Sequence, residues 1–203
     1  MSNSSVPNGS LVIRARRDAD LPACADLVRE VHSTARYPRF RPADIGQFLN
    51  PPDPFGCWVA NLDGEVAGHV ALVPRGLPAA TEIAARALGK AADQLAVVGR
   101  LFVSRQARGR GVGRLLLDTA TAEARSRGLH PVLDVDIELS AAIALYESAG
   151  WTRAGQLTVR WTHHESSELN VLKQNAARPT IERVLTEYVY VGPHPTGRVA
   201  TVR

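Results

Sequence analysis

Lysine is nearly absent from this basic chain of 203 residues. It occurs only at Lys90 and Lys173, so arginine supplies 22 of the 24 basic residues, and against 20 acidic residues the formal net charge is +4. An excess of positive charge can indicate nucleic-acid binding. Here the arginines are scattered, and no basic stripe with interleaved aromatic residues occurs. We therefore do not expect nucleic acid to be a partner.

Cysteine and long apolar runs are also scarce. Cys24 and Cys57 are the two cysteines, and we expect both to be reduced, buried thiols, as is usual in a cytoplasmic protein. No apolar run reaches the ~18 residues that a membrane-spanning helix needs. The first ten residues, MSNSSVPNGS, are polar and lack the apolar segment of a secretory signal. The sequence thus predicts a cytoplasmic protein with no membrane partner, and it leaves a homodimer open.

What the chain does contain is a regular alternation of strand and helix patterns. Hydrophobic residues make up 45% of the sequence, enough for one well-packed domain. We expect a domain at residues 11–192 between a disordered tail at 1–10 and a second tail at 193–203. Strands are predicted at 11–16, 57–61, 65–73, 96–103, 131–138, 151–162 and 181–191, and helices at 20–33, 42–49, 78–94 and 141–149. A further helix is predicted to begin among the glycines at 109–113 and to end at a cap at Gly128. This order predicts an α/β fold with a mixed sheet.

The stretch from Leu95 to Gly128 reads as a buried strand, a glycine-rich loop and an amphipathic helix. Gly109, Gly111 and Gly113 fall where the helix begins. Glycines there let the backbone approach a ligand, and the first helical N–H groups and the helix dipole favour an anion. Arginines at positions 105, 108, 110 and 114 add positive charge. The pattern indicates a site for a pyrophosphate.

Three phosphate-binding loops can be compared with this segment. A Walker loop requires Lys and then Ser or Thr after its last glycine, but Arg114 and Leu115 follow Gly113. A dinucleotide loop, counted from Gly109, requires a third glycine at position 114. The segment Arg108–Gly113 (RGRGVG) resembles instead the R/Q-x-x-G-x-G/A loop of the GNAT superfamily of N-acetyltransferases, which binds the pyrophosphate of acyl-CoA.

Other segments extend this resemblance over roughly residues 12–155. They are V-I-R-A-R near Val12, G-H-V-A-L at 68–72, R-L-F-V at 100–103, L-D-V at 133–135 and A-A-I-A-L-Y-E-S-A-G-W at 141–151. The resemblance implies the GNAT fold, a mixed sheet of about seven strands with flanking helices, whose fourth and fifth strands splay apart around acetyl-CoA. It implies pantetheine binding by the main chain of Leu101, Phe102 and Val103. Pyrophosphate would be bound by Arg108, Gly109, Arg110, Gly111, Val112, Gly113 and Arg114.

The resemblance also implies direct transfer of acetyl from the thioester to a neutral primary amine. Tyr146 matches the family's tyrosine, which can donate a proton to the departing thiolate; the alternative is a core tyrosine on an amphipathic helix. The family often carries a glutamate base near the position of Val97 and an asparagine near that of Leu139, and this chain departs from both patterns.

A base can instead come from the segment L-D-V-D-I-E-L. Period-two alternation places Asp134, Asp136 and Glu138 on one face of a strand, and Asp136 and Glu138 lie toward its end, where the acceptor should enter. They could attract a cationic amine and relay its proton, or they could form a solvated strand end. In the family, the loop at 35–41 lies over the acceptor pocket, so Tyr37 and Phe40 either contact the substrate or pack the loop.

Two histidine sites are given structural roles. His69 lies in the middle of a strand and is predicted to be a packed histidine. His163 and His164 begin a polar, irregular segment at 163–178, and no third ligand with suitable spacing follows; we expect no metal. Two functions stay open: acetyl transfer from acetyl-CoA to an amine, or an acyl-CoA-binding sensor or interaction module without transferase activity.

Overall fold

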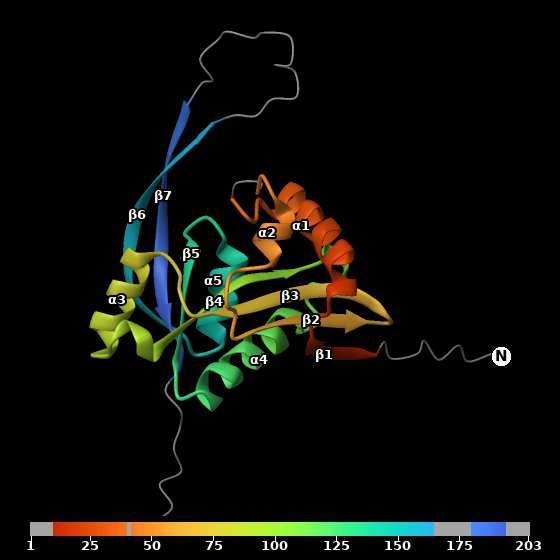
Figure 1. Cartoon of the computed structure of the whole chain (residues 1–203), viewed down its shortest axis with the longest axis horizontal. Coiled ribbons are helices and arrows are strands. Elements are labelled where there is room, and N and C mark those ends of the chain that lie inside the picture. The colour runs from red at the N-terminus through yellow and green to blue at the C-terminus, as the bar shows by residue number, and fades with distance from the viewer. Residues whose placement is uncertain (1–9, 40–41, 165–179, 194–203) are drawn as a thin grey trace, which may run out of the picture.

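A seven-stranded mixed sheet forms the centre of the protein (Figure 1). The computed structural model describes residues 10–39, 42–164 and 180–193. The strand order is β1-β2-β3-β4-β5-β7-β6, and within it only β4 and β5 pair in parallel. The strands are β1 (Leu11–Ala15), β2 (Gly56–Leu62), β3 (Glu65–Val73), β4 (Leu95–Val103), β5 (His130–Asp136), β6 (Thr152–His164) and β7 (Thr180–Val191).

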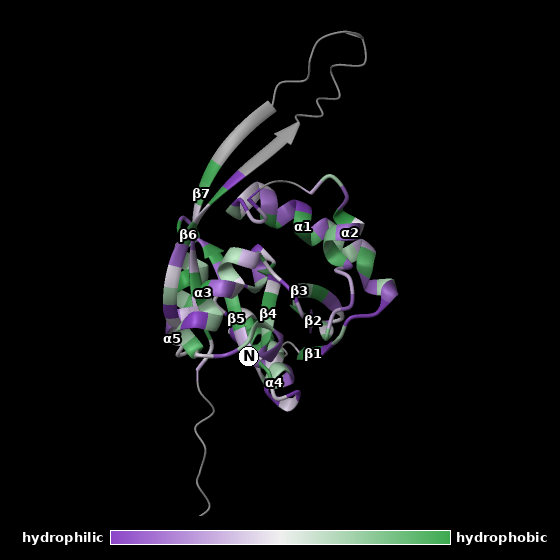
Figure 2. Ribbon diagram, turned by 60° about the vertical axis from the view of Figure 1, so that its left-hand side comes forward, coloured by the Kyte–Doolittle hydropathy of each residue, from purple (hydrophilic) through white to green (hydrophobic). Residues whose placement is uncertain are grey.

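Five helices cover the two faces of this sheet. They are α1 (Leu21–Ala35), α2 (Ile45–Leu49), α3 (Pro78–Leu88), α4 (Val112–Ser126) and α5 (Ser140–Ser148). Helices α4 and α5 pack on one face; α1 and α2 cover the other face near β3 and β4, and α3 covers it near β5, β6 and β7. Hydrophobic residues concentrate on the central strands, whereas α1 and α4 carry both hydrophobic and hydrophilic residues (Figure 2), as amphipathic helices do.

The parallel contact between β4 and β5 is short. It consists of the pairs Leu95↔His130, Ala96↔Pro131 and Val97↔Val132. Beyond Gly99 the ladder of β4 with β3 becomes irregular, and Arg100 adopts a left-handed φ of 52°. Such a bulge bends a strand and re-aims its side chains. The pairing with β5 ends at Val97, the third of the nine residues of β4, and the two strands diverge beyond it, as the resemblance implied.

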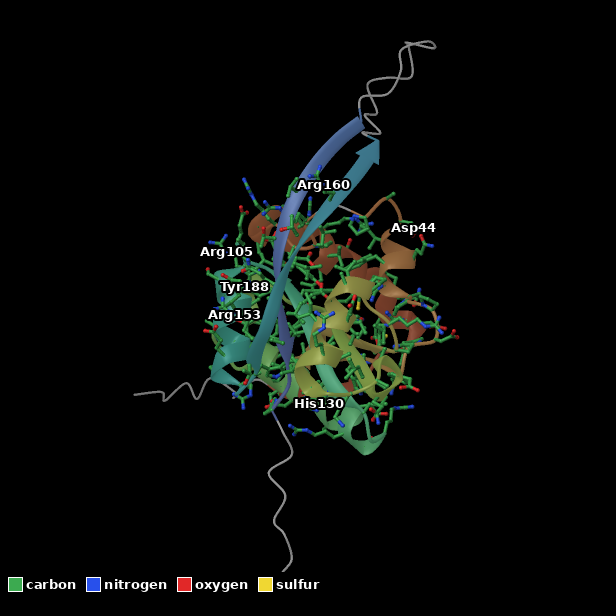
Figure 3. All side chains as sticks on the ribbon, turned by 90° about the vertical axis from the view of Figure 1, so that its left-hand side faces the viewer. Asp44, Arg105, His130, Arg153, Arg160 and Tyr188 are labelled. Atoms are coloured by element: carbon green, nitrogen blue, oxygen red, sulfur yellow. The ribbon has the colours of Figure 1, made fainter. Side chains whose placement is uncertain are left out.

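Strands β6 and β7 form a long antiparallel ribbon at the other end of the sheet. Their register runs from Thr152↔Val191 to His164↔Thr180, and the far end of the ribbon extends past the helices (Figure 1). Arg153 of β6 stacks on the ring of Tyr188 of β7 at 4.4 Å (Figure 3). This cation–π contact joins the two strands on the face they share with α5.

The predicted fold class is confirmed, while several boundaries differ. The helix predicted to reach Gln94 ends at Leu88, because Gly89 takes a left-handed conformation, and a short 3-10 turn (Ala92–Gln94) follows. Strand β5 ends at Asp136 rather than Glu138. His163 and His164 belong to β6 rather than to a loop. Apart from Ser10 and Pro193, both predicted tails lie outside the described residues, as do residues 165–179.

Helix α4 lies close to the sheet at Gly68 of β3. A Cβ atom built on Gly68 would lie 2.9 Å from Leu116 Cδ1 and 3.1 Å from the backbone oxygen of Phe102. Leu116 is completely buried, so it has no free space to move into. The absence of a side chain at position 68 thus sets the distance between α4 and the sheet.

We predict that Gly68→Ala lowers the free energy of unfolding by about 1–3 kcal/mol, since an added methyl group overpacks the core. The measurement is urea denaturation. Gly99→Ala in β4 is the matched control, because nothing lies within 4 Å of a Cβ there, and it should leave stability equal or slightly higher. Equal stability of Gly68→Ala and the wild type would contradict this account of the packing.

Candidate active site

The glycine loop between β4 and α4 has the backbone of an anion site. Gly109 and Gly111 both adopt a left-handed conformation, with φ of 74° and 78°, and nothing lies within 4 Å of a Cβ built on either. Gly111 is the residue before the helix, and no side chain caps the first turn of α4. The first N–H groups of an α-helix lack partners within the helix. They are consequently available to a ligand at a place where the dipole favours negative charge.

The arginines of this loop differ in their partners. The Nε of Arg114 donates to Asp118 at 2.9 Å, and its Nη1 donates to the backbone oxygen of Ser148 at 3.3 Å, which ties α4 to α5. Arg108 and Arg110 are exposed, and neither takes part in an ion pair among the residues that the structure describes. Their guanidinium groups, like that of the exposed Arg105, form no ion pair within the described residues and can contact an anion.

The end of β4 lies directly beside this loop. Val103 Cγ2 is 3.7 Å and Leu145 Cδ2 is 3.3 Å from a Cβ built on Gly113, so β4, α4 and α5 meet at this point. Beyond Val97, the described strands give β4 a partner only on its β3 side. The Phe102 ring is buried and stacks on the His69 ring at 5.1 Å. The main chain of Leu101–Val103 thus borders the opening between β4 and β5.

Tyr146 of α5 lies at this opening. It is buried, with its ring centroid 6.0 Å from that of Tyr190 and 6.1 Å from that of Trp151. Burial raises the pKa of its hydroxyl above the ordinary value, and the proximity of Tyr37 and Asp134 raises it further. The tyrosine is therefore protonated at neutral pH.

Tyr37 approaches the same opening from the segment that follows α1. Its ring centroid is 6.4 Å from that of Phe102. Burial of the hydroxyl raises its pKa to about 12, and Arg100, Asp134 and Glu187 lie near enough for their charges to act on it. The structure thus brings together Tyr37 and Tyr146, two residues predicted from distant segments. Phe40 lies outside the described residues.

Three acidic residues share one face of β5 and β7. In the antiparallel register, Asp136 is opposite Glu187 and Asp134 is opposite Val189, so Asp134 is the diagonal neighbour of Glu187. Residues so placed on one face are within reach of each other. Asp134 and Glu187 are hydrogen bonded to each other, and Asp136 and Glu187 are both more than nine-tenths buried.

Burial shifts the titration of Glu187 and Asp134. It raises the pKa of Glu187 to about 7, with further contributions from the charge and hydrogen bond of Asp134 and from the charge of Asp136. Burial also raises the pKa of Asp134, while its hydrogen bond with Glu187 acts in the opposite direction. The Asp134–Glu187 pair therefore keeps a proton over the lower part of the neutral range, because two carboxylates this close cannot both ionise easily.

Glu138 does not belong to this face, contrary to the prediction from alternation. Strand β5 ends at Asp136, whose Oδ1 accepts a hydrogen bond of 2.9 Å from the Glu138 backbone N–H. The Glu138 side chain is 59% exposed and forms an ion pair with Arg39, which also lies 3.5 Å from Asp136 Oδ2. The hydrogen bond from Arg39 lowers the pKa of Glu138. Glu187, supplied by another strand, occupies the place expected for the third acid.

Glu187 was missed by the sequence analysis, although β7 contains a signal for it. Leu185, Glu187 and Val189 alternate with Tyr188 and Tyr190, and all three residues on the first side are buried. A carboxylate on the buried side of a strand is rarely tolerated without a partner. What the sequence could not provide was the register that sets this residue beside Asp134.

Arg100 connects the opening to an open hollow beside α2. Its Nε donates to the backbone oxygen of Phe48, and its guanidinium lies 5.3 Å from the centre of the Phe48 ring. The hollow has a volume of about 410 Å³ and is lined by Pro42, Ala43, Asp44, Gln47, Phe48, Pro51, Pro52 and Arg100. Asp44, labelled in Figure 3, caps α2 by accepting from the Gln47 N–H at 2.9 Å. Arg100 thus lines the hollow and also lies near enough to Tyr37 for its charge to act on the Tyr37 hydroxyl.

His69 and the cysteines have structural surroundings. His69 is completely buried, as predicted, with Nδ1 3.0 Å from the backbone oxygen of Arg100, and burial lowers its pKa to about 4. Cys24 is buried, Cys57 is partly buried, and both are free thiols. Within the described ranges, no group of three or more His, Cys, Asp or Glu residues is arranged to hold a metal ion. No helix in those ranges is long and apolar enough to span a membrane.

Comparison with known proteins identifies the family to which this arrangement belongs. The profile of the acetyltransferase (GNAT) family matches residues 21–151, well over half of the chain. The chain belongs to this family, as its loop and strand motifs predicted. A comparison with curated proteins gave no match.

Solved structures show the same fold. A ribosomal-protein-alanine N-acetyltransferase from Brucella melitensis has a TM-score of 0.60 at 24% identity, covering 89% of this chain and 98% of that one. The ribosomal-protein-S18-alanine N-acetyltransferase from Escherichia coli has a TM-score of 0.59 at 18% identity, with coverages of 96% and 100%. YncA from Salmonella typhimurium, solved with its cofactor acetyl-CoA, has a TM-score of 0.59 at 21% identity, with coverages of 90% and 92%.

The buried acids should make stability depend on pH. The folded chain keeps the Glu187 proton up to about pH 7, whereas the unfolded chain releases it near the ordinary value of 4.5. Between these values the native state binds more protons, so the free energy of unfolding decreases as pH rises. We predict that Glu187→Gln raises the melting temperature relative to the wild type more at pH 8 than at pH 5.5.

Thermal denaturation at the two pH values measures this effect. Glu82→Gln is a suitable control, because Glu82 is exposed on α3 and pairs with Arg86 at 2.7 Å, and its effect should be small and equal at both pH values. A Glu187→Gln effect that did not change with pH would show that this carboxyl group titrates normally.

Proposed function

We propose that this protein transfers an acetyl group from acetyl-CoA to a primary amine by direct attack within a ternary complex. The observation that carries the proposal is the convergence of three features at one point. The uncapped start of α4, the unpaired edge of β4 and the buried Tyr146 all border the opening between β4 and β5. An anion site, a main-chain edge and a proton donor are what a CoA thioester requires.

The residues present fit acetyl-CoA as a substrate. The space beside Gly109 and Gly111 admits a phosphate group close to the main chain. The backbone N–H groups from Arg108 to Arg114 would bind the pyrophosphate, and the Arg108 and Arg110 side chains would neutralise its charge. The main chain of Leu101, Phe102 and Val103 would pair with the pantetheine amides. This placement directs the thioester toward Tyr146.

Tyr146 would act on the leaving group. Its hydroxyl is protonated at neutral pH because burial raises the pKa, so it can donate to the CoA sulfur as the carbon–sulfur bond breaks. The acceptor would enter from the side of Tyr37, Phe40 and the hollow beside α2. Asp136 and Glu138 would attract its positive charge. Arg39, which pairs with both carboxylates, would either be displaced by the amine or share the carboxylates with it. The resemblance to the family specifies the acceptor no further than a primary amine.

Turnover tests the proposal directly. Purified protein is mixed with acetyl-CoA and a panel of amines, and release of the CoA thiol is followed together with product mass. Acetylation of at least one amine with saturation kinetics supports the proposal. CoA binding by calorimetry without transfer to any amine would favour the alternative of an acyl-CoA-binding module.

The loop assignment predicts that Gly111→Glu raises the Kd for acetyl-CoA at least about tenfold, or ~1.4 kcal/mol. The added carboxylate would lie against the pyrophosphate and oppose it. Calorimetric titration gives the affinity. Gly64→Glu is the matched control, since Gly64 has a φ of 92° with open space around it and suffers the same backbone strain in the β2–β3 turn. Normal acetyl-CoA affinity in Gly111→Glu would mean that the pyrophosphate binds elsewhere.

Tyr146→Phe should lower kcat and kcat/KM together by about 10²-fold, because general acid catalysis contributes ~10²–10⁴-fold and a thiolate leaves without much assistance. The KM for acetyl-CoA should stay nearly unchanged. Tyr190→Phe is the control: it removes a neighbouring hydroxyl that donates to Glu147 at 2.9 Å, and it should affect stability more than rate. If steady-state kinetics showed full activity in Tyr146→Phe, the role of this tyrosine would be to pack the core and not to donate a proton.

A further inference from the structure

The strand β4 of this protein carries no carboxylate that could remove a proton from the acceptor. Its residues are Leu95, Ala96, Val97, Val98, Gly99, Arg100, Leu101, Phe102 and Val103. An amine is protonated at neutral pH and attacks only after losing a proton, so another element has to supply the base. The buried carboxyl groups nearest to the opening are those of β5 and β7.

We infer that Glu187, paired with Asp134, is the group that takes the proton of the acceptor's ammonium ion. This inference rests on the acetyl transfer proposed above and assigns its base. Val97 and Val132 form the last pair between β4 and β5, and Asp134 is the next residue of β5 whose side chain lies on the same face as Val132. Asp134 is thus placed where the strands part, and Glu187 is its neighbour on β7.

Glu187 has an unused acceptor atom at this place. Only 9% of the residue is exposed, and within the described part of the chain its Oε2 accepts no hydrogen bond. Asp136 Oδ2 is likewise buried without a hydrogen bond, with Arg39 3.5 Å away as an ion-pair partner. Buried oxygen atoms of this kind are costly unless something binds them. An ammonium group, with three N–H donors and a positive charge, is the complementary ligand.

The charged neighbours of Glu187 fit this role. Asp134 and Asp136 face it from β5, and Tyr37, from the segment after α1, lies near enough to sense its charge. Arg39 lies 3.5 Å from Asp136 Oδ2 and offsets part of the negative charge. On its other side, β6 presents Leu157 opposite Glu187, and α3 contributes apolar packing. The surroundings of the Glu187 carboxyl group are therefore polar on the side of the opening and apolar on the side of β6 and α3.

The chemistry balances with residues already assigned. The bound ammonium gives one proton to the ionised Glu187, and the neutral nitrogen forms a bond to the thioester carbonyl carbon as the carbon–sulfur bond breaks. Tyr146 gives its proton to the departing sulfur and takes the next proton from the nitrogen. Glu187 then releases its proton to water. One ammonium ion and one acetyl-CoA yield one amide, one CoA thiol and one proton.

The test is the pH dependence of kcat/KM for the amine in Glu187→Gln. In the wild type we expect an ascending limb near pH 7, where Glu187 loses its proton. In the variant this limb should disappear, and kcat/KM at pH 7 should fall ~10²–10⁴-fold. The kcat/KM of the variant should then rise with pH only as the fraction of free amine that is neutral rises. Glu187→Asp should keep part of the rate and an ascending limb. Glu82→Gln should behave as the wild type.

Two further arms separate catalysis from packing. Methoxyamine is neutral at pH 7 and needs no base, so Glu187→Gln should retain most of the activity toward it. Asp134→Asn should move the ascending limb to lower pH, because it removes a negative neighbour. An unchanged limb in Glu187→Gln, or an equal loss with methoxyamine and with a cationic amine, would overturn the inference while leaving acetyl transfer established. A wild type that binds acetyl-CoA but acetylates no amine would overturn both.

Discussion

The short contact between β4 and β5 is the constraint on which the site depends. Only three residue pairs join these parallel strands, and the bulge with its left-handed Arg100 turns β4 away afterwards. A sheet paired along its full length would leave no main-chain edge for a ligand and no path between the two faces. The divergence lets Tyr146, from the face of α5, approach Tyr37 and Asp134 on the opposite face.

The same opening makes the site costly to fold. Asp134 and Glu187 are carboxyl groups removed from water, and a proton shared between them limits the cost because like charges in one place cannot both ionise easily. A large apolar core around α4, together with the cluster under α3, offsets this burden. Helix α3 thus has a role that its sequence alone did not reveal: it covers the face of β5 and β7 behind the acids.

Local patterns made part of this arrangement predictable. Gly109, Gly111 and the helical spacing after them specify a strand, a loop and a helix through short-range backbone preferences. Tyr146 was found because its helix repeats a family motif. Glu187 and Arg39 were not found, since strand register and loop packing bring them to the site from distant parts of the chain. Alternation places Glu138 on the acidic face only if the strand continues two residues beyond Asp136, where β5 ends, and the sequence leaves this boundary poorly defined.

The arginines of the loop have one more chemical consequence. A thioester held near lysine amines would slowly acylate them, and each acylation would remove the positive charge of one lysine. Guanidinium groups stay protonated and so are poor nucleophiles, and Lys90 is the only lysine in the described part of the chain. If the loop binds the pyrophosphate of acetyl-CoA as proposed, its positive charge would therefore persist through repeated turnover.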